Sequence, residues 1–106
     1  MLNMKKLITK LINDFHGCDA DRKEVLSGTT VTPTHNGWLV VAATAQSSAG
    51  AAPIARIGTA GGTIFGEGMG IVSQGALFIA AAPVKAGETY TITLYRCNLS
   101  SVINYY

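Results

Sequence analysis

The side chains with the greatest potential for chemistry lie close together near the start of the chain. His16, Cys18, Asp19 and Asp21 fall within six residues, and imidazole, thiolate and carboxylate groups are all metal ligands. Their spacing matches no standard zinc motif. The pair Asp19 and Asp21 lacks the third acidic residue, the glycine and the terminal glutamate of a calcium loop. We therefore expect a polar hinge here, with no metal and no cofactor.

A glycine-rich stretch, Gly66-Glu67-Gly68-Met69-Gly70, resembles a phosphate-binding loop in its composition. It lacks the Lys-Ser/Thr pair of a P-loop, and no helical pattern follows it whose N-terminus could hold a phosphate. The sequence predicts either a surface loop at this position or a close approach between two backbone segments.

The ionisable residues of the remaining chain do not favour catalysis. His35 has no carboxylate near it in the sequence, and Glu67 and Glu88 are the only carboxylates after residue 26. Paired-carboxylate glycosidase chemistry would need both glutamates in one cleft, and Glu88 lies in a predicted turn. No Ser-His-Asp or Cys-His arrangement is indicated. We do not expect an enzyme.

The two cysteines, Cys18 and Cys97, lie in different segments and do not form a disulfide framework. Lys10 and Asn13 interrupt the first apolar run and no small-residue cleavage site follows, so a signal peptide is not expected. We expect folding in a reducing cytoplasm, where free thiols are the default. Cys97 is predicted to be a small packed residue.

Charge is distributed unevenly along the chain. Of the 106 residues, 48% are hydrophobic and 13% charged, which excludes intrinsic disorder. The net charge of +2 offers no clustered basic face beyond the first ten residues, so we expect no nucleic-acid binding. Residues 1–26 hold nine charges and residues 27–106 only five. We therefore place a boundary near Ser27, and expect the surface of the second part to be small and polar or covered by other subunits.

An amphipathic helix followed by a hinge is predicted for residues 1–26. Its apolar stripe has the i, i+3, i+4 spacing of one helix face and consists of Met4, Leu7, Ile8, Leu11, Ile12 and Phe15. We expect this face to serve in oligomerisation or docking, packed against its own domain or against symmetry mates. The flanking lysines leave a membrane-surface helix as an alternative, although no stretch approaches the ~18–20 apolar residues of a membrane span.

Residues 27–106 predict an all-β domain, an antiparallel β-sandwich of jelly-roll type, because turn-forming residues recur about every eight to twelve positions without helical periodicity. Strands are expected at 29–32, 38–44, 53–57, 63–65, 71–73, 76–80, 89–97 and 102–106. The strand at 76–80 is expected to end around Pro83. Tyr90, Ile92 and Leu94 are predicted to share one face of the strand 89–97.

Aromatic residues are candidates for a carbohydrate-binding platform or for core and interface packing. They are Trp38, Tyr90, Tyr95, Tyr105 and Tyr106. Trp38 begins an apolar strand and is predicted to lie in the core. We expect the pair Tyr105 and Tyr106 to contribute to a subunit interface.

Two segments of the domain resemble a known family. Thr30 to Val41 combines a Thr-rich entry, a proline and the run Asn-Gly-aromatic-Leu-Val-Val, and Pro83 to Ile92 contains Pro-Val-Lys-Ala-Gly-Glu-Thr. Together they resemble the trimeric knob domains of bacteriophage tail and head fibres, jelly-roll sandwiches similar to the tumour-necrosis-factor and complement globular-head folds. The resemblance spans most of residues 28–98 and assigns no receptor-binding residues.

The resemblance implies a homotrimeric, non-enzymatic structural protein of the virion, used for host-surface attachment (receptor binding) or particle decoration. Its partners would be other virion proteins and a polysaccharide or protein of the host surface. Distal loops such as 46–52 or 66–70 would carry receptor binding. Two alternatives stay open: an assembly module that docks through its N-terminal helix onto a larger virion component, and a membrane-surface protein.

Overall fold

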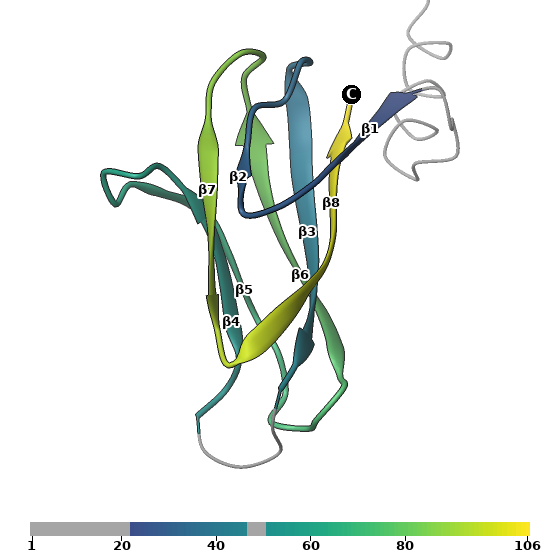
Figure 1. Ribbon diagram of the computed structural model, residues 1–106, viewed down its shortest axis with the longest axis vertical. Helices are drawn as coiled ribbons and strands as arrows, with labels where there is room; N and C mark the ends of the chain where they lie inside the picture. The colour runs from purple at the N-terminus through teal and green to yellow at the C-terminus, as the bar shows by residue number, and fades with distance from the viewer. Residues whose placement is uncertain (1–21, 47–50) are drawn as a thin grey trace, which may run out of the picture.

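The structure of the chain is a computed structural model that describes residues 22–46 and 51–106. The predicted helix stripe and the cluster around His16 and Cys18 lie outside these residues. The described residues form an all-β sandwich of two antiparallel four-stranded sheets packed face to face (Figure 1). No helix is present within residues 22–46 and 51–106.

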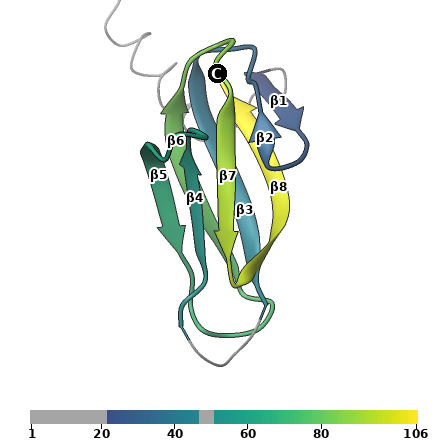
Figure 2. The ribbon, with the colours of Figure 1, turned by 60° about the vertical axis from the view of Figure 1, so that its left-hand side comes forward.

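Eight strands make up the two sheets. They are β1 (Lys23–Leu26), β2 (Thr30–Val31), β3 (Gly37–Ala45), β4 (Ile54–Gly58), β5 (Ile64–Met69), β6 (Leu77–Val84), β7 (Tyr90–Tyr95) and β8 (Cys97–Tyr105). Sheet A has the order β1-β8-β3-β6, and sheet B has the order β2-β7-β4-β5 (Figure 2). Strands that neighbour one another in a sheet are therefore mostly distant in the sequence.

Strand β1 extends the sandwich toward the N-terminus. Its four residues pair with the end of β8, from Lys23 opposite Tyr105 to Leu26 opposite Val102. The sandwich thus begins before the boundary near Ser27 that the charge distribution indicated. Charge fails as a marker here because β1 is an edge strand, and an edge strand tolerates charged side chains such as Lys23.

The core lies between the sheets and follows the period-two alternation of the strands. In β3, Leu39, Val41 and Ala43 are fully buried. Tyr90 and Ile92 of β7 face them from sheet B, and each is 3% exposed. The predicted strand 38–44 and the predicted shared face of Tyr90 and Ile92 are confirmed, and that face points into the core.

The glycine-rich stretch Gly66 to Gly70 is not a loop, because Ile64–Met69 form β5, paired with β4. The second expectation for this stretch, a close backbone approach, is confirmed. A Cβ at Gly66 would stand 2.1 Å from the carbonyl oxygen of Ala81, and one at Gly68 2.1 Å from that of Ile79. The glycines are needed because β5, an edge of sheet B, lies directly beside β6, an edge of sheet A (Figure 2).

Three other strand boundaries differ from the prediction. The residues 71–73 lie in the connection between β5 and β6 and form no strand. Strand β6 continues through Pro83, which is tolerated because β6 pairs with β3 alone and is a sheet edge. The expected strand 89–97 is broken at Arg96, whose φ of 58° turns the chain from β7 in sheet B to β8 in sheet A.

Candidate functional site

The outer face of sheet A is the most unusual surface of the sandwich. Residues directly opposite one another on paired strands share a face. In β3, Trp38 lies between Tyr105 and Pro83, and the next outward residue, Val40, lies between Ile103 and Ala81. At these positions the face therefore consists of apolar side chains across neighbouring strands, in contrast to the polar outer face that an exposed antiparallel sheet usually presents. Farther along β3 the register adds the polar residues Ser101, opposite Ala42, and Asn98, opposite Thr44.

Strand β1 continues the same face toward its edge. Val25 lies opposite Ile103 and is 70% exposed, and Lys23 lies opposite Tyr105. Within the described residues, Lys23 is the charged side chain that this register places on the outer face of sheet A. The face is thus nearly devoid of charge, in keeping with the scarcity of charge in residues 27–106.

Trp38 was predicted to lie in the core, and this prediction is wrong. Its side chain is 49% exposed, because the neighbouring Leu39 takes the inward position and successive side chains of a strand point to opposite faces. The run from Trp38 to Ala43 is apolar at every position. Such a run predicts a strand with two apolar faces, but hydrophobicity alone does not reveal which residues point inward.

Further apolar side chains are exposed along β5, β6 and the connection between them. Leu77 and Ile79 of β6 lie opposite Thr44 and Ala42 and so belong to the outer face of sheet A. Met69 lies opposite Ile54 and so shares the outer face of sheet B with the pair Arg56 and Glu67, whereas Ile71 and Val72 lie in the connection. Met69 is 64% exposed, Ile71 69% and Leu77 63%. Exposed apolar side chains that gather on one surface are typical of interaction surfaces.

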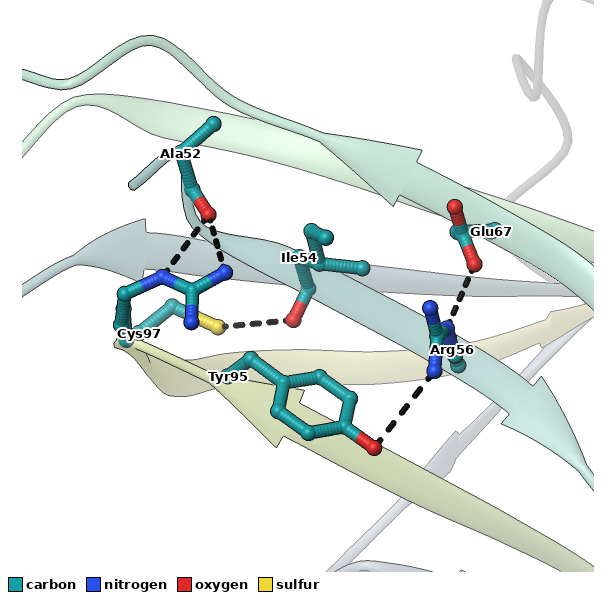
Figure 3. Close-up of polar contacts among 7 residues, drawn as sticks. Ala52, Ile54, Arg56, Glu67, Tyr95 and Cys97 are labelled. Carbon is teal, nitrogen blue, oxygen red and sulfur yellow. Dashed lines mark hydrogen bonds and ion pairs between the residues drawn. The ribbon is translucent and has the colours of Figure 1, made fainter. Parts of the chain in front are cut away.

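The outer face of sheet B has a different character (Figure 3). Arg56 of β4 donates from Nε to Glu67 Oε2 of β5 at 2.5 Å, and from Nη1 to the hydroxyl of Tyr95 at 3.5 Å. Its guanidinium carbon lies 5.1 Å from the centre of the Tyr95 ring. The hydrogen bond to Glu67 raises the pKa of Arg56. Glu67 is thus engaged in a surface ion pair, which contributes little to stability.

At one end of the sandwich, two side chains bond to backbone carbonyl oxygens just before and at the start of β4 (Figure 3). Arg96 donates from Nε and Nη2 to the carbonyl oxygen of Ala52, at 3.0 and 2.8 Å. The thiol of Cys97 donates to the carbonyl oxygen of Ile54 at 3.4 Å. Burial raises the pKa of Cys97, which keeps the thiol protonated and unreactive. The prediction that Cys97 is a packed residue is confirmed.

The other candidate residues for chemistry are bound to different partners. His35 stacks on Tyr106 with ring centres 3.6 Å apart. Glu88 accepts a hydrogen bond from the hydroxyl of Tyr90 at 3.2 Å, whereas Glu67 is paired with Arg56. Across residues 22–46 and 51–106, no group of three or more His, Cys, Asp or Glu side chains could hold a metal ion. The predicted ligands around His16 lie outside that part of the chain.

Near His35, the carboxylate of Glu24 is fixed by the connection between β2 and β3. Glu24 accepts hydrogen bonds from the backbone N–H of Thr34 at 3.0 Å and from its hydroxyl at 2.7 Å. The backbone hydrogen bond, followed by the hydroxyl, lowers the pKa of Glu24. This contact ties β1 to the connection between β2 and β3.

The aromatic residues do not form one platform. Tyr90 is buried in the core, and Tyr106 stacks on His35. Trp38 and Tyr105 lie opposite one another on the outer face of sheet A, while Tyr95 lies against Arg56 on sheet B. The expected interface position of Tyr105 agrees with the apolar face described above, and it stays a prediction.

Comparisons with known proteins give no match: no family model, no curated protein and no solved structure resembles the chain detectably. Within the described residues, no helix is long and apolar enough to cross a membrane. The surfaces of the sandwich are therefore the basis for the functional proposal.

Proposed function

We propose that this chain is a non-enzymatic structural protein of a bacteriophage virion, a homotrimeric jelly-roll knob of a tail or head fibre. It would attach to the host surface or decorate the particle. The observation that carries the proposal is the apolar outer face of sheet A, where Val25 is 70% and Trp38 49% exposed. Surfaces of this kind are typical of protein–protein contacts. A structural subunit of a virion functions through such contacts.

The strand order supports the jelly-roll part of the proposal. The first strand pairs with the last, β2 with β7, β3 with β6 and β4 with β5. This nested pairing is expected when one long antiparallel hairpin wraps into two sheets, which is how a jelly roll of eight strands is built. It agrees with the family that the sequence resembles.

The two outer faces support a division of roles. Sheet A, with almost no charge, would be covered in the oligomer, and sheet B, with Arg56, Glu67 and Tyr95, would face outward. Three copies would then present identical surfaces to a repeated polysaccharide or protein of the host. Several weak sites on one particle bind such a polymer far more tightly than one site alone, through effective concentration.

A second candidate rests on the apolar stripe of the N-terminal segment. In this alternative the stripe, which includes Leu11 and Phe15, docks the chain onto a larger virion protein. The sandwich would then take no part in assembly. A basic helix at a membrane surface would be a further use of the same stripe.

Molar mass by light scattering tests the proposal on the full chain. We expect a mass near three times 11.1 kDa, unchanged in Leu11→Asp. A trimer that Leu11→Asp dissociates would assign assembly to the N-terminal segment instead. A monomeric wild-type chain would overturn the proposal, because the outer face of sheet A would then have no copy to cover it.

A further inference from the structure

We infer that the predicted N-terminal helix packs its apolar stripe on the outer face of sheet A of its own chain. The stripe lies outside the described residues, so the contact is inferred from the surface that the sandwich offers and from the place where β1 begins. The helix covers the side of the face that β1, β8 and β3 form. The inference goes beyond the proposed function and does not depend on it.

The outer face of sheet A is apolar where these three strands lie side by side. Val25, Ile103 and Val40 lie opposite one another across β1, β8 and β3, and Trp38 lies beside Tyr105 in the same way. Val25 is 70% exposed and Trp38 49%. A helix of about 12 residues is marginal by itself in water, and most of its stability in a protein comes from packing its apolar side. The face of sheet A offers the surface that such a stripe needs.

The chain enters the sandwich beside this face. Residues 16–22 connect the end of the stripe, at Phe15, to the start of β1, at Lys23. A connection of this length spans at most about 25 Å, whereas β3 lies two strand spacings, about 10 Å, from β1. The stripe can therefore reach the face of its own chain. Because it is tethered to the sheet that it covers, its effective concentration there is high.

The dimensions of the helix leave part of the face open. A helix over residues 4–15 would be about 18 Å long and about 10 Å across. Sheet A measures about 14 Å from β1 to β6. One helix along the strands therefore covers β1, β8 and β3 but not the edge at β6. There Leu77 and Ile79 are 63% and 57% exposed, and this is the part of the face that other copies would cover.

The distribution of charge agrees with this arrangement. Residues 1–26 hold nine charges, and Lys5, Lys10 and Asp14 lie off the stripe. On the outer face of sheet A, the register of the described residues places a charge at Lys23. A helix whose stripe packs on this face turns its own charged side chains toward water. An almost uncharged sheet face is thereby replaced by the charged surface that a domain normally presents.

Trp38 can report on this contact because it is the only tryptophan of the chain. Leu11→Asp places a charge in the stripe, and Asn13→Asp, the matched control, places the same charge off the stripe. Removal of the helix exposes the indole to water, so Leu11→Asp should shift the fluorescence emission to longer wavelength and strengthen its quenching by acrylamide. Asn13→Asp should match the wild type. Unchanged emission and quenching in Leu11→Asp would overturn the inference.

A mixing experiment distinguishes the stripe of the same chain from that of a second copy. Trp38→Phe keeps the stripe but has no tryptophan, so its mixture with Leu11→Asp reports on Trp38 of the latter alone. After both chains are unfolded and refolded together, we expect the emission of Leu11→Asp. Recovery of the wild-type emission would show that the stripe covers another copy, and would overturn the inference.

The molar mass separates this inference from the proposed function. A smaller mass of Leu11→Asp than of the wild type, measured by light scattering, would show that the stripe joins copies and would overturn the contact within one chain. A monomeric wild-type chain whose Trp38 becomes exposed in Leu11→Asp would contradict the proposed function and support the inference.

A second measurement starts from the sheet and leaves the stripe intact. Val25→Asp places a charge on the covered part of the face, and Thr93→Asp, on the exposed outer face of sheet B, is its control. Trypsin should cleave after Lys10 faster in Val25→Asp than in the wild type, and at the wild-type rate in Thr93→Asp. Equal rates in all three chains would overturn the contact. Circular dichroism verifies the fold of each variant.

Discussion

Gly68 of β5 lies so close to Ile79 of β6 that a Cβ on the glycine would stand 2.1 Å from the carbonyl oxygen of the isoleucine. The two residues belong to different sheets, so this contact joins sheet B to sheet A along one side of the sandwich. Gly66 makes the equivalent contact with Ala81. Glycine is required at these two positions because a side chain would collide with the backbone of the neighbouring strand.

Gly68→Ala should destabilise the sandwich by about 3 kcal/mol, because the added methyl group meets backbone, which cannot move aside without separating the sheets. The measurement is the free energy of unfolding in urea. Gly61→Ala is the control: its Cβ would have Thr59 Oγ1 at 3.8 Å as its neighbour, so its effect should stay within about 0.5 kcal/mol. Equal effects of the two substitutions would show that the close approach is absent.

Arg96 holds a left-handed backbone conformation, with φ of 58°, while its side chain bonds to Ala52. Arg96→Gly and Arg96→Ala both remove these hydrogen bonds, but only glycine relieves the backbone strain. We therefore expect the glycine variant to be about 1 kcal/mol more stable than the alanine variant. Thermal or urea unfolding of the two variants measures this difference. Identical stabilities would mean that the turn at residue 96 is unstrained.

Asn104 is a polar residue in the interior. It is fully buried, its Nδ2 donates to the carbonyl oxygen of Trp38 at 3.2 Å, and its Oδ1 has no hydrogen-bond partner. Asn104→Asp would place an unpaired charge there and should cost about 3 to 5 kcal/mol at neutral pH.

The loss caused by Asn104→Asp should shrink as the pH falls. Burial raises the pKa of such an aspartate, so stability relative to wild type is lost as the pH rises through that pKa and regained below it. A protonated carboxyl group can also donate to the carbonyl oxygen of Trp38. Asn98→Asp, on the exposed part of the same strand, should show no comparable loss. Urea unfolding at several pH values distinguishes the two, and a loss independent of pH would contradict a buried charge.

Glu24 links β1 to Thr34, and its pKa lies below the usual 4.5 because the Thr34 backbone N–H and hydroxyl donate to it. Its carboxylate therefore stabilises the folded state at neutral pH, and this contribution is lost as the pH falls below 4.5 through the lowered pKa. Glu24→Gln should be less stable than wild type at pH 7, with a difference that narrows in acid.

Thr34→Val provides a graded comparison for Glu24. It removes the hydroxyl but keeps the backbone N–H, so its acid dependence should fall between those of the wild type and Glu24→Gln. The measurement is the unfolding midpoint in urea as a function of pH. A Glu24→Gln chain with the same pH profile as wild type would contradict the role of this carboxylate.

The sequence allowed the class of fold to be predicted, and particular strands with it. Tyr90 and Ile92 alternate with threonines, and this alternation identified the apolar face of β7. A strand with one buried face has apolar residues at every second position. Trp38 could not be placed in the same way. Its strand is apolar on both sides, and only the packing of sheet B against one face of sheet A buries Leu39 and leaves Trp38 exposed.

The scarcity of charge after residue 26 predicted a surface that is either small and polar or covered by other subunits, and this prediction depends on composition alone. Where the uncharged apolar face lies was decided by the tertiary structure, because it depends on which strands become neighbours. The register that sets Val40 beside Ile103 and Ala81 creates the apolar face of sheet A. Likewise, the glycines of β5 are visible in the sequence, but the tertiary structure decides that they lie against the backbone of β6. A close approach involves two segments, and the sequence does not show which second segment is the neighbour.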